Sequence, residues 1–158
     1  MKTYKLFRIR DGDLFPLYVE HRRKIETGVW LDAHIGELAD EDHVRSRGGN
    51  ALSLRPGWHS TEIPFTDWIG KRMPDGTLAQ KLDTIWCECE VKGKQIETVD
   101  RNGLRTIPDG WYYFRTNSRQ KRPWIISNKI KVNRKLTHEE VVEICAGFGI
   151  VAQKLATS

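Results

Sequence analysis

Residues 84–91 read Thr-Ile-Trp-Cys-Glu-Cys-Glu-Val, and this stretch decides the fold class. Small or apolar side chains occupy its odd positions, while a tryptophan and two glutamates occupy its even positions. The two sets are Ile85, Cys87, Cys89 and Val91, and Trp86, Glu88 and Glu90. Successive side chains of a β-strand point to opposite faces of the sheet. A period of two therefore predicts a strand with one buried face.

The N-terminal segment predicts a β-hairpin. Residues 4–10 alternate, with Lys5, Phe7 and Ile9 on one side, and the returning strand covers residues 14–20. Between them, Asp-Gly at positions 11 and 12 is a strong hairpin turn. Proline has no N–H to donate to a ladder. Because position 16 is a proline, we expect the second strand at a sheet edge or bulged.

Shorter strands and two loops are expected between the hairpin and residues 84–91. The predicted strands are a short buried one at 29–31 and another at 51–54 that stops at Pro-Gly. The charge-dense residues 37–50 predict a flexible loop, because they end in turn residues and show no apolar period. Residues 70–81 predict a second loop around Met-Pro-Asp-Gly.

The C-terminal half predicts further strands and one helix. The strands are expected at 96–99, paired with 84–91, and at 111–116, 124–127 and 130–132 in one antiparallel sheet. Thr137 and Glu140 have the spacing of a capping box. Apolar side chains then recur at helical spacing from Val141 to Phe148, which predicts an amphipathic helix.

These elements predict an α+β fold, a curved antiparallel β-sheet with one C-terminal helix packed on it. A length of 158 residues suits a single domain, 1–158, with a flexible charged loop at about 37–50. A hydrophobic content of 39% is enough for a core. No apolar run approaches the roughly 18 residues of a membrane helix, and no secretory signal is visible. We therefore expect a cytoplasmic protein with no membrane partner.

The sequence lacks the motifs of several kinds of metal site and enzyme. Cys87 and Cys89 sit two apart among apolar neighbours, and Cys145 falls on the helix stripe. This spacing suits core cysteines better than a zinc site, so we expect no metal. The chain has neither GxGxxG nor GxxxxGK[ST], which argues against nucleotide-dependent dehydrogenases and P-loop enzymes. It has no GxSxG elbow either. We expect no cofactor.

Positive charge is concentrated in residues 110–138. This stretch carries eight lysines and arginines and no acidic residue. Because the whole chain is formally +5, the remainder carries −3. The candidate binding residues of this stretch are Trp111, Tyr113, Arg115, Arg119, Lys121, Arg122, Lys129, Lys131, Arg134 and Lys135. Stacking aromatics within a basic groove are typical of surfaces that hold single-stranded nucleic acid or RNA. The alternative is a solvated face whose charges meet the acidic remainder.

Residues 55–61 form the second candidate contact. We interpret them as a loop in which Arg55 binds a carboxylate or phosphate, Trp58 stacks and His59 titrates. The alternative is a turn anchored by its tryptophan, with the arginine paired internally. Glu88 and Glu90 share a strand face and could support acid–base chemistry, or they could pair with cations of a neighbouring strand.

Motifs along the whole chain resemble a family of small proteins encoded by bacteriophages and bacterial mobile elements, which also occurs as a domain of phage polyproteins. The residues that carry the resemblance are Lys5-Leu6-Phe7-Arg8, Leu14–Val19, Trp30–Ala33, Leu54–His59, Trp68-Ile69-Gly70, Trp86–Glu90 and Lys131–Arg134. The resemblance implies a phage-like origin and a bacterial host, with an anti-defence, anti-CRISPR-like role as one reading. It brings no catalytic residue with it.

The leading hypothesis is a non-enzymatic protein that binds nucleic acid, RNA or single strands above all, or a host nucleoprotein such as an RNA-guided defence complex. The rival is a small transferase or hydrolase on a nucleotide-like substrate, for example an ADP-ribosyltransferase. Its site would combine Arg55, His59 and one of Glu88 and Glu90. A structural component of a viral particle is the third hypothesis. The sequence leaves the oligomeric state open.

Overall fold

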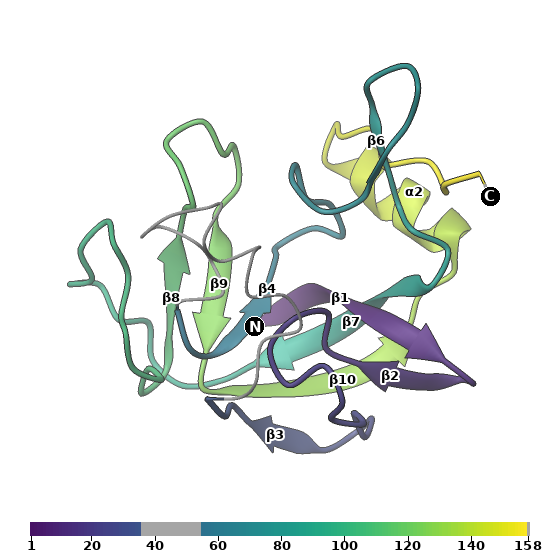
Figure 1. Ribbon diagram of the computed structural model, residues 1–158. Helices are drawn as coiled ribbons and strands as arrows, with labels where there is room; N and C mark the ends of the chain where they lie inside the picture. The colour runs from purple at the N-terminus through teal and green to yellow at the C-terminus, as the bar shows by residue number, and fades with distance from the viewer. Residues whose placement is uncertain (36–54, 158) are drawn as a thin grey trace.

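The computed structural model describes residues 1–35 and 55–157, and within them a five-stranded antiparallel sheet forms the main body (Figure 1). Its strand order is β2-β1-β7-β10-β3. The bounds are β1 (Lys2–Arg10), β2 (Asp13–Phe15), β3 (Trp30–Asp32), β7 (Thr84–Val91) and β10 (Lys129–Lys135). β7 lies at the centre because its alternating side chains give it one face for each of two cores.

A smaller sheet continues the curve beyond the edge of β1. Its order is β4-β9-β8, with bounds β4 (Trp58–Ser60), β9 (Trp124–Ser127) and β8 (Trp111–Phe114). Reciprocal backbone hydrogen bonds of 2.8 Å between Tyr4 and Thr61 join the two sheets. A short hairpin, β5 (Lys71–Arg72) and β6 (Leu78–Ala79), stands apart from both.

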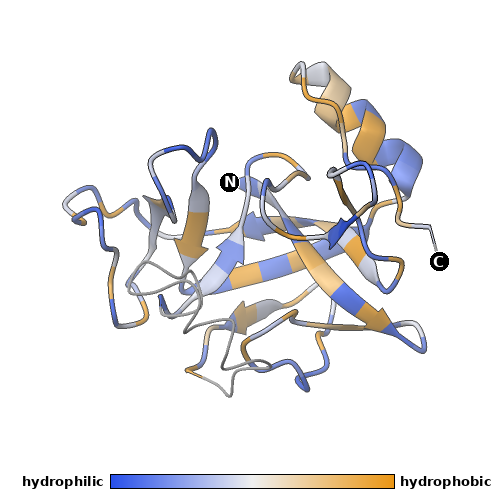
Figure 2. Ribbon diagram, turned by 45° about the horizontal axis from the view of Figure 1, so that its top comes forward, coloured by the Kyte–Doolittle hydropathy of each residue, from blue (hydrophilic) through white to orange (hydrophobic). Residues whose placement is uncertain are grey.

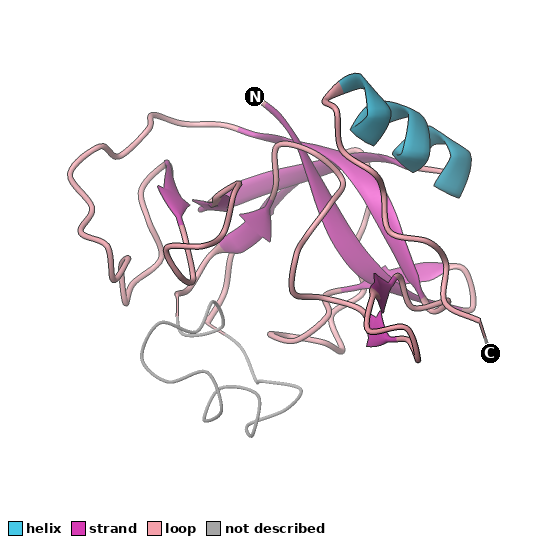
Figure 3. Ribbon diagram, turned by 90° about the horizontal axis from the view of Figure 1, so that it is seen from above, coloured by secondary structure: helices cyan, strands magenta, loops and turns pink. Residues whose placement is uncertain are grey.

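Each face of the large sheet covers its own core. On one face, Phe7, Cys87 and Cys89 pack with Trp58 and Ile125 of the small sheet. On the other face, a second cluster lies under helix α2 (His138–Gly147). That cluster comprises Tyr4, Leu6, Leu17, Trp86, Leu136, Val141 and Cys145. Figure 2 shows the alternation of hydropathy along the strands, and Figure 3 shows α2 lying against the large sheet, away from β8.

The strongest local signals are confirmed. β7 spans the expected residues 84–91, with its apolar positions in one core and the glutamates on the opposite face. The capping box is present, because the Thr137 and Glu140 side chains each accept the other's backbone N–H at 3.1 Å. The fold class is the expected α+β arrangement of a curved antiparallel sheet with a C-terminal helix.

Four local expectations are wrong. The second hairpin strand ends at Phe15 instead of residue 20, because Pro16 cannot extend the ladder. The strand at β3 is not buried, since Trp30 is 38% exposed. Residues 96–99 form no strand, and the Ile96 N–H bonds the Trp111 carbonyl rather than β7. The expected loop 70–81 contains β5 and β6.

Two larger expectations also change. The three C-terminal strands do not share one sheet, because the chain leaves β9 at Ser127, crosses Asn128 and enters the large sheet as β10. Residues 58–60 form β4 rather than a loop, paired with β9. The predicted flexible loop at 37–50 and the predicted strand at 51–54 lie outside the described residues. Within the described ranges, no helix is long and apolar enough to cross a membrane.

Candidate functional site

Three of the four cations of β10 form ion pairs with acidic residues of other elements. Lys131 pairs with Glu90 at 3.0 Å, and Lys129 pairs with Asp32. These cations hold the pKa of both carboxyls below the ordinary range, mainly through direct hydrogen bonds. Arg134 contacts Glu88 at 3.8 Å and also Glu140 of α2.

At the end of β10, the Lys135 ammonium donates to the Gly12 carbonyl at 2.8 Å and forms no ion pair among the described residues. The geometry of β10 is as expected, because its lysines face outward and its isoleucine and valine face the core. The positive charges of Lys129, Lys131 and Arg134, however, are paired with carboxylates inside the fold.

The loop between β8 and β9 keeps its positive charge. Arg115 is used within the loop, where it donates to the carbonyls of Gln120 at 3.0 Å and Lys121 at 3.4 Å. Arg119 and Lys121 are exposed at the tip. Arg122 lies 5.5 Å from the centre of the Phe148 ring. Within the described ranges, Arg119, Lys121 and Arg122 form no ion pair.

Two aromatic residues of β8 face the same side, as expected from the alternation. Trp111 and Tyr113 form an edge-to-face pair, with ring centres 5.2 Å apart and planes at 87°. Tyr113 is 40% exposed, while Tyr112 and Phe114 on the other face are buried. Tyr113 is therefore open to a stacking partner close to the basic loop.

The three candidates of residues 55–61 lie mostly in the interior. Arg55 is 1% exposed and stacks on Phe114, and its Nε–H donates to the Asn102 carbonyl. Trp58 is 6% exposed and donates from Nε1 to the Leu31 carbonyl at 3.0 Å. A macromolecular partner therefore has no direct access to the Arg55 guanidinium in this structure.

His59 is held neutral by its surroundings. Its Nε2 lies 2.7 Å from the Arg55 carbonyl, so this nitrogen carries the hydrogen and donates. Burial, with the positive charge of Lys5 beside it, lowers the pKa of His59 to about 3. The expected titration near neutral pH is therefore wrong for this histidine.

A pocket of about 90 Å³ opens at the edge of β1, between the points where Thr61 and Phe15 pair with that strand. The described part of its lining includes four tryptophans, a lysine and two histidines. They are Trp58, Trp68, Trp86, Trp124, Lys5, His34 and His59. Thr116 and Trp124 also line it, and they stand at the two ends of the basic β8–β9 loop.

Lys5 is the least expected member of this pocket. Its Nζ donates to the His59 carbonyl at 2.8 Å and lies 5.5 Å from the Phe7 ring centre and 6.0 Å from that of Trp58. Burial lowers the pKa of this ammonium to about 8. Within residues 1–35 and 55–157, no carboxylate forms an ion pair with Lys5.

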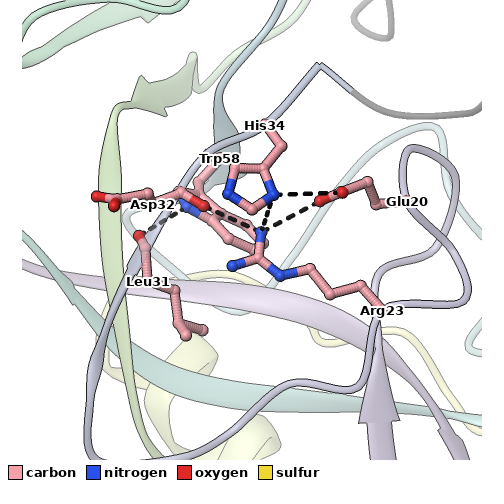
Figure 4. A network of polar contacts seen from close by, with 6 residues as sticks. All are labelled: Glu20, Arg23, Leu31, Asp32, His34 and Trp58. Atoms are coloured by element: carbon pink, nitrogen blue, oxygen red, sulfur yellow. Dashed lines mark hydrogen bonds and ion pairs between the residues drawn. The ribbon is translucent and has the colours of Figure 1, made fainter.

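A polar network closes one side of the pocket (Figure 4). Arg23 donates to Glu20 at 3.1 Å and to the Asp32 carbonyl at 3.0 Å. Its guanidinium lies 5.1 Å from the Trp58 ring centre. The His34 Nδ1 is 3.3 Å from Glu20. The network ties the segments after β2 and β3 to β4, and each oxygen of the Glu20 carboxylate has one partner in it.

The predicted enzyme site is not assembled. Lys5 is the cross-strand partner of Cys87, and its side chain reaches the His59 backbone, so the His59 region lies on the Cys87 face of the large sheet. Glu88 and Glu90 project from the other face and pair with Arg134 and Lys131. The sheet itself therefore separates these carboxylates from His59.

The sequence interpretation missed Lys5, Trp124 and the Glu20–Arg23 network. A signal for Lys5 was available, because the alternation of β1 places it on the same side as Phe7 and Ile9. All three cysteines are free and buried, in agreement with their assignment to the core. Among the described residues, no cluster of three His, Cys, Asp or Glu side chains is placed to hold a metal ion. No protein-family model, curated protein or solved structure matches the chain.

Proposed function

We propose that this protein binds single-stranded nucleic acid without acting on it chemically, through the β8–β9 loop and the aromatic residues beside it. One observation carries the proposal: Arg119, Lys121 and Arg122 form no ion pair among the described residues, whereas Lys129, Lys131 and Arg134 of β10 do. Cations that are not neutralised internally are the ones available to phosphates, and such contacts dominate nucleic-acid affinity.

Exposed aromatic side chains on β8 and in the pocket beside the loop favour a strand with exposed bases. Tyr113 is 40% exposed on β8, and Trp68, which lines the pocket, is 39% exposed. Bases stack on such rings only when they are not paired with another strand. A duplex would meet the cations of the loop but would leave the aromatic surfaces unused.

The test compares two sets of charge removals within the same basic segment. We expect the triple variant Arg119→Gln/Lys121→Gln/Arg122→Gln to lose affinity for a fluorescent single-stranded oligonucleotide. In a plot of log affinity against log salt concentration, its slope should flatten by about 2, since each phosphate contact on a single strand contributes about 0.7. The double variant Arg119→Gln/Lys121→Gln, which leaves the Phe148 contact intact, should flatten it by about 1.4.

The matched control is Lys129→Gln/Lys131→Gln, which removes two cations of the same segment that are already paired with Asp32 and Glu90. Its salt slope should equal that of the wild type. Equal slopes for the loop variants and the wild type would overturn the proposal. The proposal would also be overturned if the wild type bound no oligonucleotide and captured a host protein instead. That outcome would point to a nucleoprotein or protein partner.

A further inference from the structure

We propose that the pocket beside the basic loop is a phosphate site that takes the terminal phosphate of a strand, with Lys5 as its cation. The choice of a strand as the carrier of the phosphate rests on the proposed function. The phosphate chemistry itself rests on the pocket, so a free nucleoside monophosphate is the other source of the same group.

The first argument is the missing counter-charge. Lys5 lies in the wall of the pocket, with its ammonium near the rings of Phe7 and Trp58, and its described polar partner is one carbonyl oxygen, that of His59. A lysine ammonium has three donors, and removing a charge from water without a charged partner is costly. An anion bound in the pocket would compensate the Lys5 charge.

The second argument is an unused donor on a residue that lines the same pocket. Trp124 lines the pocket and is 6% exposed, and its buried Nε1–H has no acceptor among the described residues. Buried donors are nearly always satisfied in folded proteins, so an orphan calls for an explanation. Trp124 follows directly on the basic loop, at the start of β9. An oxygen of a bound phosphate group is an acceptor of the kind that this N–H lacks.

A third donor comes from the edge of β1. Odd-numbered residues of this strand bond to β7 and its flanks, as in the 2.7 Å bond from the Ile9 N–H to the Asp83 carbonyl. Tyr4, an even-numbered residue, bonds away from β7 to Thr61. By the same alternation the Leu6 N–H points away from β7, and Leu6 lines the pocket.

The acidic group of the pocket does not oppose an anion strongly. Glu20 is already paired with Arg23 at 3.1 Å and contacts His34 at 3.3 Å. Lys5 is left as the uncompensated charge among the described lining residues. A terminal phosphate carries a charge of about −1.5 to −2 near neutral pH, against −1 for an internal diester. A pocket of about 90 Å³ also suits a terminal phosphate better than a continuous strand.

The experiment uses one single-stranded sequence in three forms: with a 5′-phosphate, with a 3′-phosphate and with hydroxyls at both ends. We expect one phosphorylated form to bind the wild type about tenfold more tightly than the hydroxyl form, the scale of one charge-assisted hydrogen bond. Lys5→Gln should abolish this preference. Lys2→Gln, on the same strand but with its lysine directed to Glu88, should retain it.

The outcomes separate the two proposals. Equal affinity for all three forms of the oligonucleotide in the wild type overturns the phosphate site and needs no variant to interpret. In that case the loop variants still test the proposed function. A phosphate preference that persists while the Arg119→Gln/Lys121→Gln variant binds like the wild type supports the pocket and refutes the loop. Competition by thymidine 5′-monophosphate, but not by thymidine, supports the site and identifies a free nucleotide as a second source.

Discussion

Replacement of Lys5 by methionine should change how the stability of the protein depends on pH. The Lys5 ammonium has a pKa of about 8 in the folded protein, against an ordinary value of 10.5, because burial disfavours its charged form. Between these two values the unfolded chain binds the proton and the folded protein does not. The stability of the wild type should therefore rise with pH through this window, by the linkage of proton binding to folding.

The magnitude follows from the size of the shift. A difference of about 2.5 between the two pKa values corresponds to about 3 kcal/mol, at about 1.4 kcal/mol for each unit. Below pH 8 the wild type bears this whole cost of a buried charge, and by pH 10.5 most of the cost is gone. Methionine has a similar length and no charge. The free energy of unfolding of Lys5→Met minus that of the wild type should thus fall by about 3 kcal/mol from pH 7 to pH 10.5.

Urea denaturation followed by tryptophan fluorescence at a series of pH values measures this difference. The control is Lys81→Met, because Lys81 is exposed and its replacement removes a lysine without relieving a buried charge. Parallel stability curves for Lys5→Met and the wild type would refute the reasoning, since they would mean that the Lys5 ammonium is as well solvated in the folded protein as in the unfolded chain.

Three further substitutions test the fold around the site. The pKa of His59 is about 3 in the folded protein, against an ordinary value of 6.5, so the unfolded chain takes up a proton that the folded protein does not. Between pH 6.5 and pH 4.5 the wild type should therefore lose about 2.5 kcal/mol more stability than His59→Gln, as measured by urea denaturation at a series of pH values. Gly57→Ala should cost more than Gly12→Ala in thermal unfolding. Both glycines have positive φ, but a Cβ at Gly57 would lie 2.7 Å from Ile126, whereas one at Gly12 meets nothing within 4 Å; equal losses would contradict the close packing. Thr137→Ala should cost about 1 kcal/mol by removing the helix cap, while Thr137→Ser should retain most of it, and an Ala variant as stable as the wild type would count against the capping box.

The sequence by itself determined the elements whose signals are local. The alternation of β7 specifies a strand and its two faces within eight residues, and the capping box specifies the start of α2 within four. The Asp11-Gly12 turn likewise appears with positive φ at both residues, as a tight hairpin requires. Such features depend on neighbours along the chain, so a pattern in the sequence contains the whole of their cause.

Tertiary structure alone decided which charges are available for binding. In the sequence, nothing distinguishes Lys129 and Lys131 from Arg119 and Lys121. In the structure, only Lys129 and Lys131 pair with carboxylates, those of Asp32 and Glu90, because β10 pairs with β3 and β7. The pocket has the same origin. Lys5 and Trp124 are far apart in the chain and line one space because the small sheet curves past the edge of β1. Strand order and register are set by the burial of both cores together, and no local stretch of sequence contains that information.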